Sequence, residues 1–116
     1  MITDEAIVAF NSRLVDLSKL EKFTPHQRDK VKLTGNKAKS LLNNPDFAMF
    51  VYQYKFQLCD ALSDIKGYTE ESINQRLAIG HQIAGIQGFV DSLHSMTYYG
   101  NKAGKLEELA NSLQDD

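Results

Sequence analysis

The sequence contains few of the residues that form disulfide bonds or bind structural metal ions. Its 116 residues include no tryptophan, two prolines and a single cysteine, Cys59. One cysteine excludes an internal disulfide framework and any zinc site made of several cysteines. The chain must therefore be held together by packed side chains, which a domain of this length can supply.

Long hydrophobic runs and a strong charge bias are also missing. The longest stretch without a charged residue, Leu77 to Val90, contains His81, Gln82 and Gln87, so it is too short and too polar to cross a bilayer. We expect no membrane partner. The net charge of -2 excludes an overall basic coat for nucleic acid, and the 42% hydrophobic content excludes wholesale disorder.

Apolar residues recur every three or four positions along most of the chain, which predicts an all-α fold. Thr24 before Pro25, and Asn44 before Pro45, are typical of helix starts, where a capping side chain precedes a proline. The predicted parts of this single domain, residues 1–116, are an N-terminal helix (1–23), a basic helical segment (24–44) with a break near 34–36, a helical hairpin (45–99), and a short C-terminal helix with a frayed tail (100–116).

The middle of the sequence predicts a long antiparallel helical hairpin. The apolar face of its first helix, about 45–66, consists of Phe47, Phe50, Val51, Tyr54, Leu58, Ala61, Leu62 and Ile65. Lys66 and Gly67 end this helix, and Thr69 caps a second one over 70–97. Because so few residues separate the two helices, we expect them to fold back on each other, with the N-terminal helix and short flanking helices packed across them.

The second hairpin helix is apolar on more than one side. Gly80, Ala84 and Gly88 form a row of small residues, which permits close approach by another helix of this chain or of a second copy. We interpret this row as a packing surface, with a hinge or a partner groove as alternatives. Phe89 and Met96 widen the apolar surface of this helix further, so we expect a homo-oligomer. Tyrosine is favoured at interfaces, so we also expect a protein partner. The candidate partner-binding residues are Gly80, Ala84, Gly88, Phe89, Met96, Tyr98 and Tyr99.

Positive charge is local to residues 24–44, which have a net charge of +4. The five basic residues of this segment are Arg28, Lys30, Lys32, Lys37 and Lys39. We interpret them as a solvated helix face, with an acidic protein surface or nucleic-acid phosphates as alternatives. Aromatic residues do not alternate with these basic residues, so nucleic acid is the last of the three interpretations.

The sequence contains no constellation of residues typical of an active site. His26, His81 and His94 are too widely spaced to form a zinc pair. Asp60 and Asp64 share one helical face, but two carboxylates alone predict a solvated surface. We therefore expect no catalytic residue, no cofactor, no metal and no enzymatic activity.

One resemblance to a known group of proteins involves residues 40–96. The stretch Ser40 to Phe47 (SLLNNPDF), the long amphipathic helix after it and the run Ile83 to Phe89 (IAGIQGF) resemble small all-helical proteins encoded among tailed-bacteriophage structural and assembly genes. The resemblance implies a virion component or assembly factor rather than an enzyme, in the virion or the host cytoplasm.

With the apolar seams, this resemblance leads us to expect a protein that self-associates and docks on a larger phage structural protein or host protein. Two alternatives stay open, ahead of a small helical enzyme or metal protein, which ranks last because no cluster of candidate groups converges. One is a small phage-encoded inhibitor or regulator of a protein partner. The other is a nucleic-acid-binding packaging factor that uses residues 28–39.

Overall fold

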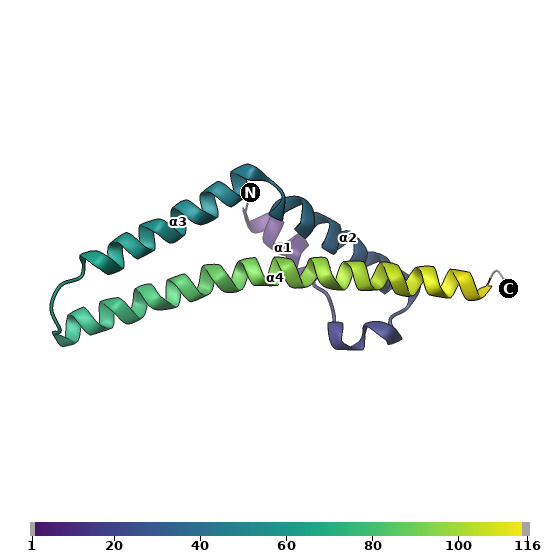
Figure 1. Ribbon diagram of the computed structural model, residues 1–116. Coiled ribbons are helices and arrows are strands. Elements are labelled where there is room, and N and C mark those ends of the chain that lie inside the picture. Colours follow the sequence, from purple (N-terminus) through teal and green to yellow (C-terminus); the bar gives the residue numbers. More distant parts are fainter. Residues whose placement is uncertain (1, 115–116) are drawn as a thin grey trace.

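The computed structural model describes residues 2–114, and these residues form an elongated molecule made of helices (Figure 1). It measures 70 × 27 × 27 Å. The elements are α1 (Ile2–Ser12), the 3₁₀ helix η1 (Leu17–Lys22), α2 (Pro25–Leu42), α3 (Pro45–Asp64) and α4 (Glu70–Gln114). The predicted all-α fold is confirmed.

Side-chain caps fix the starts of α2 and α3 where the sequence predicts them. The Thr24 hydroxyl accepts the Gln27 N–H, and the Gln27 side chain accepts the Thr24 N–H in return. The Asn44 side chain accepts the N–H groups of Asp46 and Phe47. Each cap satisfies backbone donors that have no partner inside the helix.

The N-terminal helix is shorter than the expected span of 1–23. The helix α1 ends at Ser12, and Asp16 then caps η1 by accepting both the backbone N–H (3.0 Å) and the hydroxyl (2.7 Å) of Ser18. These two hydrogen bonds hold the pKa of Asp16 below its usual value. Because the Asp16 side chain offers the backbone a local alternative to helical hydrogen bonds, it separates two short elements.

Two expected helix breaks are absent. The helix α2 continues through 34–36, and α4 continues far beyond 97, through Gly100 and Gly104, to Gln114. The short separate helix expected over 100–116 was therefore wrong, and the expected frayed tail at 115–116 lies outside the described residues. The contact described next explains why Gly35 and Gly100 are tolerated in the interior of a helix.

The helices α2 and α4 cross at two glycines. A Cβ atom added to Gly35 would lie 2.8 Å from the Gly100 Cα and 2.8 Å from the Met96 carbonyl oxygen. A Cβ added to Gly100 would lie 2.9 Å from the Gly35 Cα. The backbones can approach this closely only because neither residue has a side chain, and the resulting contact compensates for the low helix propensity of glycine.

The hydrophobic core lies where η1, α2 and the C-terminal half of α4 meet. Its buried members are Leu20, Phe23, Val31 and Ala103, and the half-buried residues around them are Leu14, Leu17, Tyr99 and Leu106. The sequence had placed the main core between α3 and α4 instead. The 3₁₀ helix η1, the helix α2 and the C-terminal half of α4 thus form the best-packed part of the molecule.

The helices α3 and α4 run in opposite directions, with residues 65–69 joining them (Figure 1). Leu58 of α3 is buried, but Phe50 and Tyr54, which we expected to face α4, are 62% and 41% exposed. Phe47, another member of the predicted face, packs its ring edge-on against Phe89 of α4 at 6.3 Å. The buried side of α3 therefore keeps Phe47 and Leu58 of the predicted face but not Phe50 and Tyr54.

The connection between α3 and α4 requires a glycine. Gly67 has a φ of 81°, a left-handed conformation that residues with side chains rarely adopt. The Arg76 guanidinium donates to the Gly67 carbonyl oxygen at 2.6 Å, and the Ser72 hydroxyl donates to the Lys66 carbonyl oxygen at 3.0 Å. These bonds fasten the connection to the first two turns of α4.

Candidate functional site

Side chains that could bind a metal ion are not grouped in the described part of the chain. Residues 2–114 hold no group of three or more histidine, cysteine, aspartate or glutamate side chains placed to bind a metal ion. No helix among them is long and apolar enough to cross a membrane. The candidate sites described next are exposed surfaces.

The row of small residues on α4 is exposed. A Cβ atom at Gly80 or Gly88 would meet nothing within 4 Å, and Ala84 between them is exposed too. Packing of this row against another helix of the same chain was therefore a wrong interpretation. The half-buried side of α4 includes Ile83 and Ile86 instead, and the row of small residues lies on a different side of the helix.

The other candidate partner-binding residues of α4 do not join this row. Phe89 is 48% exposed and packs on Phe47. Met96 and Tyr99 are half-buried and line a hollow beneath α1. Tyr98 is 61% exposed, with its ring edge-on to Tyr99 at 5.2 Å. The structure thus distributes the predicted residues over separate places along α4.

The basic segment does not present its five charges together. The Arg28 guanidinium donates to the Phe23 carbonyl oxygen at 2.8 Å. The Lys32 ammonium bonds the Glu107 carboxylate of α4 at 2.6 Å, which raises the pKa of Lys32. Lys30 and Lys37 share one flank of α2, and helical geometry places Lys39 on another. Two of the five bases thus serve the contacts of α2 within the chain.

A surface that the sequence analysis missed lies on α3. Met49, Tyr52 and Phe56 are 45%, 57% and 64% exposed, and Cys59 next to them is exposed as well. These four residues, here named the α3 stripe, are spaced by three, four and three positions and so share one side of the helix. The signal was present in the sequence, but the neighbouring row from Phe47 to Ile65 was the longer one.

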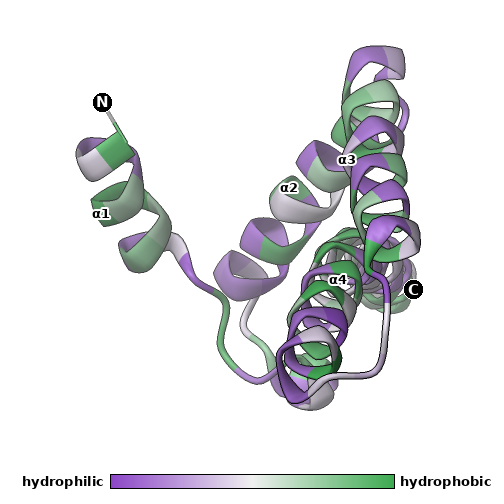
Figure 2. Cartoon of the chain, turned by 90° about the vertical axis from the view of Figure 1, so that its left-hand side faces the viewer, coloured by the Kyte–Doolittle hydropathy of each residue, from purple (hydrophilic) through white to green (hydrophobic). Residues whose placement is uncertain are grey.

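A second exposed apolar surface belongs to α1. None of its residues is buried, and Figure 2 shows α1 standing apart from α2, α3 and α4. The exposed large apolar residues of α1 are Ile2, Ile7, Val8 and Phe10. An amphipathic helix without a packing surface in its own chain is suited to one on a partner.

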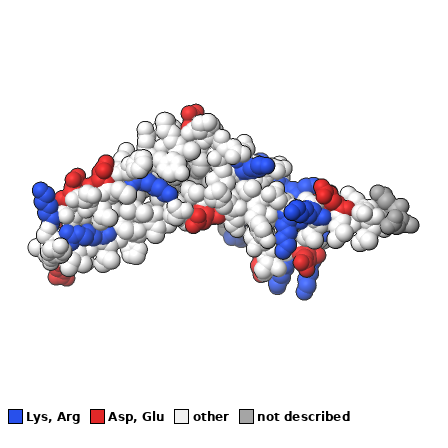
Figure 3. All heavy atoms as spheres, viewed as in Figure 1, with Lys and Arg blue, Asp and Glu red and all other residues white. Residues whose placement is uncertain are grey.

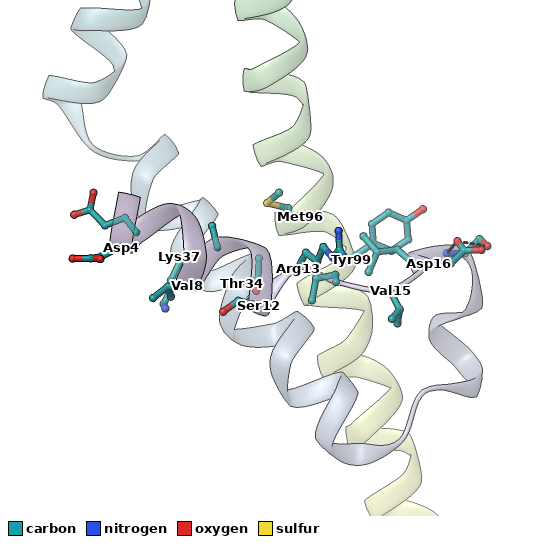
Figure 4. A pocket seen from close by; sticks show the side chains of 15 residues that line it. Asp4, Val8, Ser12, Arg13, Val15, Asp16, Thr34, Lys37, Met96 and Tyr99 are labelled. Atoms are coloured by element: carbon teal, nitrogen blue, oxygen red, sulfur yellow. Dashed lines mark hydrogen bonds between the residues drawn. The ribbon is translucent and has the colours of Figure 1, made fainter. Parts of the chain in front are cut away.

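The hollow beneath α1 connects this helix to the rest of the molecule. It has a volume of about 1110 Å³ and is lined by α1, the segment 13–18, α2 and α4 (Figure 4). Val8 of α1 and Lys37 of α2 lie toward one end and Tyr99 of α4 toward the other, with Thr34 of α2 between them. The hollow is open and mostly apolar, which makes it an extension of the α1 surface.

The chain exposes more surface than its mass requires. Its accessible surface is 8922 Å², whereas a compact monomer of 13.1 kDa exposes about 6400 Å². The excess of about 2500 Å² is larger than the roughly 800 Å² per partner that a standard protein interface buries. A second protein surface could therefore cover a large part of this chain.

Comparison with known proteins assigns no family to the chain. No family model, no curated protein and no solved structure matches the sequence. Its function is therefore inferred from its own sequence and surfaces.

Proposed function

We propose that the protein is a non-enzymatic assembly protein of the phage virion type, which self-associates and docks on a larger protein through exposed helical faces. The observation that carries this proposal is the excess of about 2500 Å² in accessible surface over a compact chain of the same mass. A chain that leaves so much surface uncovered is suited to burying it against other molecules.

The exposed surface is apolar in two separate places, which suits two different contacts. The α3 stripe lies on one arm of the molecule, and the apolar residues of α1 lie near the hollow lined by Met96 and Tyr99. Methionine and aromatic residues are enriched in protein interfaces and are costly to leave in water. One surface can serve self-association and the other a larger partner.

The phage context of the proposal rests on the resemblance of residues 40–96. In the structure these residues form the end of α2, all of α3 and the first half of α4. The resembling segment therefore includes the α3 stripe but excludes α1 and most of the basic segment. We assign self-association to the resembling segment and partner docking to α1.

The two alternative functions differ from this proposal in testable ways. An inhibitor or regulator would use the same apolar surfaces but act as a monomer on one target. A packaging factor would need the basic residues of α2 to face a nucleic acid together. The separation of Lys30 and Lys37 from Lys39, and the bond between Lys32 and Glu107, favour the assembly protein over the packaging factor.

The neighbouring genes and the purified particles test the proposal. We expect portal, capsid or tail genes beside this one, and we expect mass spectrometry to detect the chain in particles or assembly intermediates. Early genes on both sides, together with a chain that is missing from particles and intermediates, would support the inhibitor instead.

A further inference from the structure

The α3 stripe is an apolar surface with very few charges around it. Residues 47–59 carry one charged group, Lys55, and its ammonium is bonded to the Gln87 side chain of α4 at 2.6 Å. The rings of Tyr52 and Phe56 stack on each other at 6.5 Å in the middle of the stripe. Figure 3 shows mostly uncharged surface over the middle and N-terminal part of α3.

The area of this surface indicates the size of its partner. Three large side chains of the stripe are 45–64% exposed: Met49, Tyr52 and Phe56. At about 200 Å² for a whole large side chain, they present roughly 300 Å² of apolar surface. With a polar rim, this area approaches the roughly 600 Å² that one partner contributes at the small end of stable interfaces. A second helix of similar length is enough to cover it.

A second copy of α3 fits this description, since it brings an equal apolar area and the same spacing of side chains. The intervals between positions 49, 52, 56 and 59 are those of a helical seam that packs against another such seam. A two-fold contact between identical surfaces closes after two chains and leaves no part of the stripe uncovered. A dimer is therefore the simplest assembly that covers the α3 stripe.

The charges at the ends of α3 select the direction of pairing. In a parallel pair each residue lies beside its own copy, so Asp60 would oppose Asp60 of the partner subunit and the helix dipoles would align unfavourably. In an antiparallel pair centred at the level of Tyr54, Asp60 lies level with Ala48 of the partner subunit. Only the antiparallel direction avoids opposing like charges.

We propose that α3 pairs antiparallel with α3 of a second copy, an inference that rests on the self-association part of the proposed function. Tyr52 then faces Phe56 of the partner subunit, and Met49 faces Cys59 of the partner subunit. The two native cysteines lie about 15 Å apart along the helix axis, which is too far for a disulfide bond.

The single variant Met49→Cys tests this register. Under mild oxidation it should form a disulfide with Cys59 of the partner subunit, so that most of the chain migrates as a covalent dimer on non-reducing electrophoresis. The matched control is Phe50→Cys, which exposes a thiol one residue along but about 100° around the helix. The wild type and the control should stay uncrosslinked, and the native mass of each protein is measured in parallel.

The other outcomes separate the two proposals. A wild-type protein that crosslinks through Cys59 alone would show a parallel pair and overturn the inference. In another outcome, the wild type has the mass of a dimer while the Met49→Cys variant folds but does not crosslink. This result would overturn the pairing through the α3 stripe and leave self-association standing. A monomeric wild type at every concentration would overturn both.

Discussion

Gly35 and Gly100 meet backbone to backbone where α2 crosses α4. A Cβ on either residue would approach the other backbone within 2.9 Å, closer than real side chains come. Val31 and Ala103, both buried in the core, lie one helical turn from this crossing. The two glycines therefore set the distance between the helices that enclose the core.

Replacing Gly35 by alanine should destabilise the protein. The added methyl group meets backbone atoms of α4, which cannot move aside, so we expect a loss of about 1–3 kcal/mol in the free energy of unfolding. Urea denaturation measures this change. The control is Gly85→Ala on α4, where a Cβ meets nothing within 4 Å and the helix should gain up to about 1 kcal/mol. Equal changes in the free energy of unfolding for the two variants would contradict the close contact between α2 and α4 at Gly35.

Gly80→Ala and Gly88→Ala should each stabilise the protein. Both positions are exposed in the interior of a helix, and alanine is the better helix former by up to about 1 kcal/mol. Thermal unfolding at several protein concentrations provides the measurement. A loss of stability that grows with concentration would mean that a second chain covers the glycine row, contrary to the interface assigned to α3.

Leu58→Ala should cost about 2–5 kcal/mol of stability, because Leu58 is buried at the contact between α3 and α4 and its removal leaves a cavity. Phe50→Ala should change the stability of the monomer by less than about 0.5 kcal/mol, because Phe50 is 62% exposed. The two variants are compared at low concentration by urea denaturation. A larger loss of stability from Phe50→Ala than expected would show that Phe50 is buried in the core.

Removal of residues 2–12 should leave the stability of the remainder almost unchanged. The helix α1 buries none of its residues, so we expect the free energy of unfolding, measured by urea denaturation, to change by no more than about 0.5 kcal/mol. Binding to the larger partner should be lost at the same time. A large loss of stability would show that α1 packs on its own chain in solution.

Replacing Lys30, Lys37 and Lys39 by glutamine should leave folding intact, since all three side chains are exposed. The wild type should not bind duplex DNA tightly at physiological salt. Lys32 is kept because it bonds Glu107. Tight, salt-sensitive DNA binding that the triple variant abolishes would make the packaging factor the better function, because each lost phosphate contact lowers the salt dependence.

Local sequence signals predicted the local features of the fold. Thr24, Asn44 and Gly67 act through bonds or backbone angles within a few residues, so their neighbours in the sequence were sufficient to place two helix starts and one connection. The all-α class followed from the periodicity of apolar residues.

Features that depend on contacts between distant residues could not be read in the same way. Gly35 and Gly100 each look like helix breakers, and only their contact across α2 and α4 explains two unbroken helices. The apolar faces of α3 presented a similar ambiguity. Two rows of large residues run along that helix, and the position of α4 decides which of them, through Leu58, is buried. The row through Leu58 is the longer one, so the α3 stripe on the other row was missed.

A second copy of the chain should cover the α3 stripe that one copy leaves exposed. Light scattering on the purified wild type and on the variant Phe56→Glu measures whether it does. We expect the wild type to have twice the 13.1 kDa mass of one chain and Phe56→Glu to have the mass of a single chain with unchanged helical circular dichroism. A wild type that stays at 13.1 kDa up to high concentration would contradict this expectation and favour a monomeric inhibitor.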